Sequence, residues 1–226
     1  INETSYTGKG VKVAVIDTGI DLKHPDLQRN YRGGYDLVDL DDVPQETTLE
    51  EGMPTSHGTH VAGIIAANGK IKGVAPDAEI YAYRALGPGG VGTSVQIIAA
   101  LEEAVKQGVD IINLSLGSDV NGPDYPTSRA VNEAAKHGIA IVVANGNAGP
   151  AHWTVGSPAT ASGAFSVGAY QDKKEFIYFV DQETERTMRL YPLTAPTTWD
   201  FPNRHEVTHE NDPNVFGKIV FVEKWE

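Results

Sequence analysis

Apolar runs recur along the first 170 residues of the chain, and stretches with helical spacing separate them. Most of these runs are short and rich in Val and Ile, as expected of strands in a covered sheet. The expected strands are residues 11–16, 79–85, 109–114, 139–144 and 165–169, and the expected helices are residues 57–67, 94–107 and 128–137. This alternation predicts an α/β fold, in which a parallel sheet carries helices on both faces.

Polar residues and caps stand at the ends of these elements. Thr93 can cap the helix that follows it, and Gly108 is placed to end that helix. Asp17, Ser115 and Asn147 each come shortly after an expected strand. Because sites in open parallel sheets gather at the carboxyl ends of the strands, these three residues are candidate site residues.

The character of the chain changes after about Tyr170. Residues 171–226 are rich in charge and proline and show no helical period, although residues 216–223 have the pattern of a strand. We therefore expect two regions, one of residues 1–170 and a second of residues 171–226.

Composition narrows the classes of function. The net charge of −12 argues against nucleic acid as a partner, because phosphates require a basic face. No apolar run approaches the roughly 18 residues needed to cross a membrane, so we expect no membrane partner. The absence of cysteine excludes disulfides and thiol catalysis. Because residue 1 is Ile, we expect a chain that was processed or trimmed.

The segment Ile16-Asp17-Thr18-Gly19 places a carboxylate after a buried strand. One reading is a turn-forming Asp. A second is the Asp-Thr-Gly motif of aspartic proteases, but that chemistry needs a second carboxylate, and the chain has no second such motif.

The segment from Ser56 to Gly63 contains His57 and His60, three residues apart. Two such histidines on a helix could bind zinc, but the Glu of the His-Glu-x-x-His pattern is missing and no third ligand is placed. The small residues in this segment indicate instead a helix packed closely beneath a site.

Six motifs carry a family resemblance, and they lie at residues 13–21, 24–27, 57–63, 73–76, 112–117 and 145–147. In this order they resemble the subtilisin-like serine proteases, over roughly residues 5–170. Within that family, the chain is most similar to members with an inserted protease-associated domain, like the minor extracellular proteases of Bacillus. The resemblance implies a catalytic domain that is incomplete at residue 170 and a β-rich inserted domain that begins at residue 171.

Carried over to this chain, the resemblance implies a catalytic triad and an oxyanion donor. His57 is the expected general base, and an imidazole suits that role because its pKa lies near the working pH. Asp17 is expected to accept from the other ring nitrogen, which fixes the tautomer. Asn147 is expected to donate its side-chain amide to the oxyanion. The alternative interpretation of Asn147 is a glycine-flanked turn with no catalytic role.

The resemblance also implies two edges that pair with an extended peptide. Ser115-Leu116-Gly117 would form one edge, and the loop with Gly90 and Gly92 would form the other. A phosphate-binding loop is the weaker reading of that glycine-rich segment, because no Lys-Ser or Lys-Thr follows.

The nucleophilic serine of the family has no full counterpart in this sequence. The family motif is Gly-Thr-Ser-Met-Ala-x-Pro, and Gly92-Thr93-Ser94 matches only its first three letters before Val95. We therefore expect the serine beyond residue 226, on the remaining C-terminal portion of the protease, and a chain that is inactive alone.

Metal binding follows the family only in part. The strong calcium loop of the family lies where this chain has residues 67–73, which are few and carry two lysines, so we expect that site to be absent. The acidic segment 36–51 could hold a hard cation, but a solvated face is the favoured reading. No metal or cofactor is expected to take part in the chemistry.

The sequence thus supports a secreted, extracellular serine endopeptidase that acts on peptides or proteins. The alternative from another class is a non-catalytic relative that binds peptides or serves as a scaffold. Retention of the acid, the base and the amide together favours the enzyme.

Overall fold

The computed structural model describes residues 6–149, 151–169, 177–181, 187–190 and 219–220. The chain divides into two compact units, residues 1–168 and residues 169–226. In the part of the chain that the structure describes, no helix is long and apolar enough to cross a membrane.

The first unit is built on a six-stranded sheet whose order is β2-β3-β1-β4-β5-β6. Every neighbouring pair in it is parallel, as the alternation of strand and helix predicts. The strands are β1 (Lys12–Asp17), β2 (Tyr31–Asp36), β3 (Glu79–Arg84), β4 (Ile111–Leu114), β5 (Ala140–Ala144) and β6 (Ala164–Val167).

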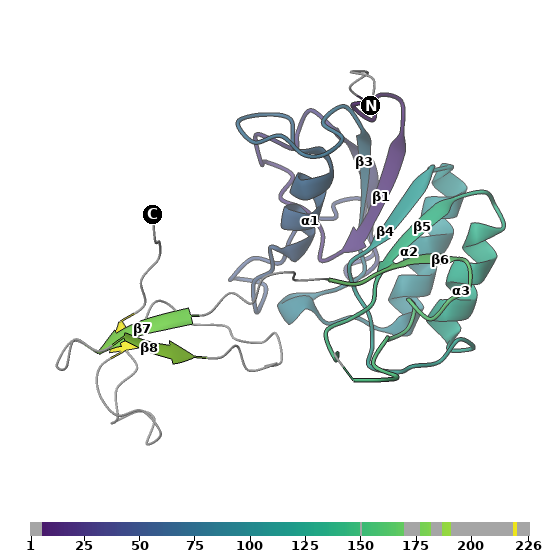
Figure 1. Cartoon of the computed structure of the whole chain (residues 1–226). Helices are drawn as coiled ribbons and strands as arrows, with labels where there is room; N and C mark the ends of the chain where they lie inside the picture. Colours follow the sequence, from purple (N-terminus) through teal and green to yellow (C-terminus); the bar gives the residue numbers. More distant parts are fainter. Residues whose placement is uncertain (1–5, 150, 170–176, 182–186, 191–218, 221–226) are drawn as a thin grey trace. The chain divides into compact units, whose positions relative to one another are not determined.

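Helices cover both faces of this sheet, as predicted. Figure 1 shows α1 (His57–Ala66) on one face, and α2 (Ser94–Gln107) and α3 (Pro126–Ala135) on the other. The alternation of side chains along β1 supplies both cores. Val13 and Val15 pack on the α1 side, whereas Ala14 and Ile16 pack on the side of α2 and α3.

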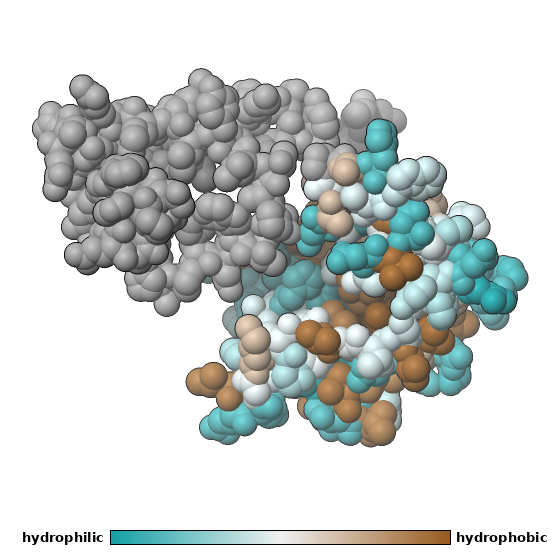
Figure 2. All heavy atoms as spheres, turned by 90° about the horizontal axis from the view of Figure 1, so that it is seen from below, coloured by the Kyte–Doolittle hydropathy of each residue, from teal (hydrophilic) through white to brown (hydrophobic). Residues whose placement is uncertain are grey.

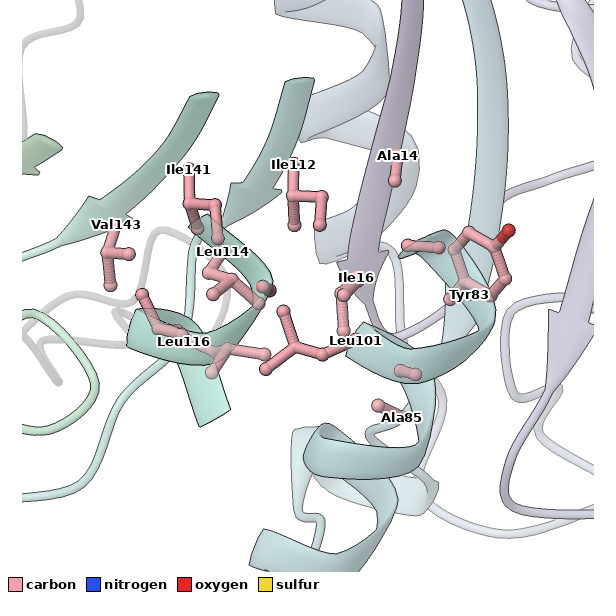
Figure 3. Close-up of a cluster of buried hydrophobic side chains, with 14 of the residues drawn as sticks. Ala14, Ile16, Tyr83, Ala85, Leu101, Ile112, Leu114, Leu116, Ile141 and Val143 are labelled. Atoms are coloured by element: carbon pink, nitrogen blue, oxygen red, sulfur yellow. The ribbon is translucent and has the colours of Figure 1, made fainter. Parts of the chain in front are cut away.

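The larger core lies beneath α2 and α3. Figure 3 shows Ile112, Leu114, Ile141 and Val143 from β4 and β5 pointing toward Leu101 of α2. All of them are nearly or fully excluded from solvent. This packing holds β1, β4 and β5 in a fixed register, so their carboxyl ends lie side by side at one edge of the sheet.

The observed elements follow the predicted ones closely, with three differences. The helix α3 begins two residues earlier than predicted, because Pro126 fits the first helical position, where no N–H is needed. A short 3₁₀ turn, Pro88–Gly90, occupies the predicted glycine-rich loop. The strand β2 was not predicted, since its Gly33-Gly34 pair carries no strand signal.

Gly34 is nevertheless required in β2. A Cβ at this position would lie 1.6 Å from the carbonyl oxygen of Ala82 on β3, and φ of Gly34 is +152°. The two strands can therefore pair here only because the residue has no side chain.

The second unit contains a three-stranded antiparallel sheet of order β8-β7-β9. Its strands are β7 (Ile177–Asp181), β8 (Thr187–Leu190) and β9 (Ile219–Val220). The strand β9 falls inside the strand predicted at 216–223, whereas β7 and β8 were not predicted. Most of residues 171–226 lie outside the described residues, so their assignment to an inserted protease-associated domain stays a prediction.

Candidate active site

Asp17 is the last residue of β1 and is fully buried. Its Oδ1 accepts a hydrogen bond of 2.7 Å from the backbone N–H of Thr18, and its carbonyl oxygen accepts from the N–H groups of Ala85 and Leu86. The carboxylate is thus fixed at the end of a central strand. Its other oxygen, Oδ2, is buried without a hydrogen-bond partner among the described residues.

His57 is the first residue of α1 and meets this carboxylate directly. The distance between His57 Nδ1 and Asp17 Oδ1 is 2.7 Å. The imidazole is half exposed, with 55% of its side chain accessible, while Asp17 is completely covered. Because an ionised carboxylate only accepts, Nδ1 is the ring nitrogen that donates, and Nε2 of the neutral ring remains free to take a proton.

The close approach of α1 to β1 depends on Gly58. A Cβ on this residue would lie 2.0 Å from the carbonyl oxygen of Gly19 and 3.1 Å from Cβ of Asp17. Gly19 has a φ of +98°, which lets the chain turn sharply after the strand. The two glycines together allow the imidazole to reach the buried acid.

The electrostatic setting favours the protonated ring of His57. The hydrogen bond to Asp17 raises the pKa of His57, burial opposes this effect, and the negative charges of Asp17 and Glu46 add to it. An imidazole with a raised pKa is a stronger base, provided that the pH is high enough to keep it neutral.

The first turn of α1 is capped by residues far away in the sequence. Ser56 occupies the N-cap position, but its side chain makes no capping hydrogen bond. Instead, Thr18 Oγ1 accepts from the N–H of Gly58 at 2.9 Å, and Glu46 Oε1 accepts from the N–H of Thr59 at 2.8 Å. The helix start is therefore bound to the end of β1 and to the loop between β2 and α1.

The glycine-rich loop lies against the residue that follows Asp17. A Cβ on Gly90 would lie 3.9 Å from Cγ2 of Thr18, and φ of Gly90 is +74°. Gly92 is constrained by packing instead, since its Cβ would lie 2.2 Å from the carbonyl oxygen of Ala85. The structure thus places this loop beside the turn that follows Asp17. The role of Gly90 and Gly92 as a peptide-binding edge stays a prediction.

Ser115, Leu116 and Gly117 directly follow β4, the neighbour of β1 in the sheet. Ser115 Oγ accepts a hydrogen bond of 3.0 Å from the Asn113 side chain, Leu116 is buried and Gly117 is exposed. In the part of the chain that the structure describes, the backbone groups of Leu116 and Gly117 have no hydrogen-bond partner. Their role as a peptide-binding edge stays a prediction.

Asn147 is exposed in the bend that follows β5, two residues after Asn145. Gly146 before it has a φ of +90°, so the chain turns here as a glycine permits. The order β1-β4-β5 brings Asp17, Ser115 and Asn147 to the same edge of the sheet. No hydrogen bond joins Asn147 to His57 or Asp17 in the described structure, and its role as an oxyanion donor stays a prediction.

Ser94, the residue that imitates the family's serine motif, stands at the start of α2. It is partly buried as the first helical residue, directly after the N-cap Thr93. Among the hydrogen bonds of the described residues, none joins Ser94 to His57. The geometry gives no support to Ser94 as a nucleophile activated by this base.

The acidic segment before α1 surrounds an arginine of the chain itself. Arg84 Nη1 donates to Asp36 Oδ2 at 2.7 Å and also to Asp39, and Nη2 donates to Thr47 Oγ1 at 2.8 Å. Arg84 is only 3% exposed, so this is a buried ion pair. The guanidinium of Arg84 thus binds the carboxylates of Asp36 and Asp39, two of the ligands that a metal cation in this segment would need.

Residues 67–73 fold back on Asp26. Its two carboxylate oxygens accept hydrogen bonds of 2.9 and 3.0 Å from the N–H groups of Lys70 and Ile71. These two hydrogen bonds lower the pKa of Asp26, and the bond from Ile71 has the larger effect. Lys72 Nζ donates to Asn68 Oδ1.

Within the described residues, no group of three or more His, Asp or Glu side chains is arranged to hold a metal.

The loops around the site expose apolar side chains. Met53 and Val91 are 70% and 74% exposed, and the carbonyl oxygen of Met53 accepts from the N–H of Gly89 at 2.9 Å. Figure 2, which views the molecule of Figure 1 from below, shows apolar residues interleaved with polar ones over the described part of the face it presents. Such a surface offers both dispersion contacts and hydrogen bonds to a ligand.

The fold and the Asp–His pair define the class of protein, and comparison with known proteins agrees. Among solved structures, a cold-adapted subtilisin-like serine proteinase matches with a TM-score of 0.62 and 30% identity, over 75% of this chain and 58% of that one. Sphericase matches with a TM-score of 0.65 and 32% identity, over 84% and 61%. The fold is therefore subtilisin-like.

The family follows from the sequence. Residues 8–212 match the model of the subtilase family, peptidase family S8, and the chain belongs to that family. It is 56% identical over 173 residues to the minor extracellular protease Vpr of Bacillus subtilis (strain 168), and 45% identical over 166 residues to subtilisin Savinase of Lederbergia lenta. These matches cover 75% and 72% of this chain, but 22% and 56% of the two relatives.

Two residues of this site were not identified from the sequence. Glu46 was grouped with the solvated acidic segment, but it is 5% exposed and bonded to α1. Thr18 was part of a motif without a role of its own. No local pattern marks either residue as a helix cap, because the helix they cap begins 11 and 39 positions further along the chain.

Proposed function

We propose that this chain provides the acid and the base of a serine endopeptidase. The observation that carries the proposal is the 2.7 Å contact between His57 Nδ1 and the buried carboxylate of Asp17. In this mechanism, Nε2 of His57 takes the proton of a serine hydroxyl as that oxygen attacks the peptide carbonyl. Asp17 holds the ring in the required tautomer and stabilises the imidazolium that forms.

The nucleophile and the oxyanion donor complete the proposal. The serine lies beyond residue 226, since the motif around Ser94 is incomplete and no hydrogen bond joins Ser94 to His57 among the described residues. Asn147 donates its amide to the oxyanion, a contribution worth about 10²–10³ in turnover, as known from subtilisin itself. His57 returns the proton to the leaving amine, and water then releases the acyl group by the same route.

The substrate is an extended peptide or an exposed protein segment. Ser115, Leu116 and Gly117 form one edge for its backbone, and Gly90 and Gly92 form the other. The backbone groups of Leu116 and Gly117, which have no hydrogen-bond partner among the described residues, support this assignment. The similar protein of Bacillus subtilis is named as an extracellular protease, which supports a secreted protein that acts outside the cell.

Complementation tests the proposal. A chain ending at Glu226, the same chain mixed with the remaining C-terminal portion, and the full-length protein are assayed with a peptide library. The full-length protein is expected to cleave peptides, while the chain ending at Glu226 stays at background. The full-length Ser94→Ala variant serves as the matched control and is expected to keep its activity.

Two results would contradict the proposal. Turnover by the chain ending at Glu226 alone would move the nucleophile into the sequence described above. A folded full-length protein that binds peptides without cleaving them would establish the alternative, a subtilisin-like peptide-binding or scaffolding protein.

A further inference from the structure

Glu46 is a buried carboxylate beside the candidate site. It is 5% exposed, and its Oε1 accepts from both the N–H and the hydroxyl of Thr59, at 2.8 and 2.9 Å. Its second oxygen, Oε2, is buried without a hydrogen-bond partner in the described part of the chain. An ionised group in such a place requires compensation, because burial without partners is unfavourable.

The compensation comes from the start of α1. The N–H groups of a first helical turn carry partial positive charge, and Thr59 is the third residue of the helix that His57 begins. Thr59 Oγ1 in turn accepts a hydrogen bond of 2.8 Å from the N–H of Asp21. Glu46 thus contacts the same helical turn that carries the imidazole.

Glu46 is itself held in place from two sides. Its N–H donates to the carbonyl oxygen of Ile20 at 3.3 Å, and the N–H of Ile20 donates to Pro44 at 2.9 Å. On the other side, the hydroxyl of the neighbouring Thr47 accepts from Arg84. The backbone that carries Glu46 is therefore held between the turn after β1 and the buried arginine of β3.

The charges that face His57 come from two elements. Asp17 on β1 acts through its hydrogen bond and its charge, and Glu46 acts through its charge from the loop between β2 and α1. The guanidinium of Arg84 is engaged by Asp36 and Asp39 rather than by Glu46. Two buried carboxylates on different elements thus act on one imidazole.

We propose that Glu46 is a positioning residue of this site, whose carboxylate holds the first turn of α1, and with it the imidazole of His57, against Asp17. The proposal rests on the proposed function of His57 as general base. It assigns Glu46 no contact with substrate. Its effect is on the orientation and the protonation of the base.

The test uses the full-length protein and three variants. Glu46→Gln removes the charge and keeps an acceptor for Thr59, whereas Glu46→Ala removes both. Glu50→Gln, an exposed residue of the same loop, is the matched control for loss of one negative charge. The readouts are an NMR titration of the His57 ring, and kcat and KM of peptide cleavage across pH.

We expect both Glu46 variants to lower the pKa of His57 and to move the acid limb of kcat to lower pH. Glu46→Ala is expected to lower kcat further, by roughly tenfold, with KM almost unchanged, because the imidazole loses its alignment. Glu50→Gln should behave as the parent protein. A purely structural role for Glu46 would lower the melting temperature and leave the titration of His57 where it was.

The inference is overturned if folded Glu46→Gln and Glu46→Ala proteins keep the parent titration of His57 and the parent kcat. Because the side chain of Glu46→Gln keeps the size and shape of the original, this variant can still test the inference if Glu46→Ala does not fold. The titration requires no turnover, so it separates this inference from the proposed function. A protein without peptidase activity whose His57 titration still responds to Glu46→Gln would refute the function and support the coupling.

Discussion

The helices α1 and α2 begin in contrasting ways, although each starts at a residue that resembles part of a protease motif, His57 in α1 and Ser94 in α2. The helix α2 starts at Ser94 with a capping box, in which Thr93 and Gln96 satisfy each other's backbone N–H groups. The helix α1 starts at His57, and its caps are Thr18 and Glu46. The backbone N–H groups at the start of α2 are thus bonded by neighbouring residues of the sequence, whereas those at the start of α1 are bonded by residues of other elements.

The difference indicates what each helix start does. A local cap stabilises a helix wherever that helix lies, and it fixes no distance to any other element. The tertiary caps of α1 fix the position of His57 relative to β1, where Asp17 ends the strand. A site that depends on a 2.7 Å contact between two elements requires this second kind of cap.

The largest contrast is expected from removing the first side chain of each helix. In the full-length protein, His57→Ala should lower turnover by about 10⁶-fold, a loss known from subtilisin itself, because the serine loses its base. Ser94→Ala should leave turnover within about twofold, since no hydrogen bond joins Ser94 to His57 in the described part of the chain. Steady-state kinetics of both variants check this, and a large loss in Ser94→Ala alone would contradict the assignment.

A smaller loss is expected when the partner of His57 changes. Asp17→Asn keeps the shape of the side chain but no longer holds the ring in the required tautomer, so kcat should fall by about 10⁴-fold. Asp124→Asn, the same exchange at an exposed position, is the control. An Asp17→Asn protein with nearly full turnover would show that the contact with His57 has no catalytic role.

The pH dependence is the next effect in size. The hydrogen bond to Asp17 raises the pKa of His57, and the base works only when it is neutral. Activity should therefore fall as the pH drops, with the midpoint of the acid limb of kcat/KM above the ordinary value of about 6.5. A profile of kcat/KM from acid to neutral pH measures it, and a midpoint clearly below that value would disagree with the geometry.

The smallest effect is expected from breaking the local cap of α2. Thr93→Ala should lower the free energy of unfolding by about 1 kcal/mol, because the N–H of Gln96 loses its acceptor. Denaturant unfolding measures this loss, and kcat and its pH profile should not change. A shifted pH profile in Thr93→Ala would erase the distinction between the two helix starts.

The same contrast explains how much could be predicted from the sequence. The helix α2 was predicted with its bounds, since Thr93 and Gly108 mark both ends within the helix's own sequence. The central strands were predicted because they are covered on both faces and read as apolar runs. The strand β2 was missed because it contains Gly34, which normally argues against a strand. Gly34 is present because the backbone of Ala82 on β3 lies too close for a side chain, and no local sequence pattern reveals this contact.

The site follows the same division. Asp17 and His57 could be named from their motifs, and the structure contains the hydrogen bond that this naming predicts. Glu46 could not, because an acidic residue in an acidic segment looks solvated until the fold buries it. The pairing of Asp36 with Arg84 was hidden for the same reason, since the two residues are 48 positions apart.

The most direct test of the central claim is to find the serine that reacts. The full-length protein is treated with a serine-directed phosphonyl reagent, and the labelled residue is located by peptide mapping. We predict one labelled serine beyond residue 226, loss of activity in step with labelling, and no labelling of the His57→Ala variant. Labelling of Ser94 with parallel loss of activity would contradict the account, because it would place the nucleophile on α2.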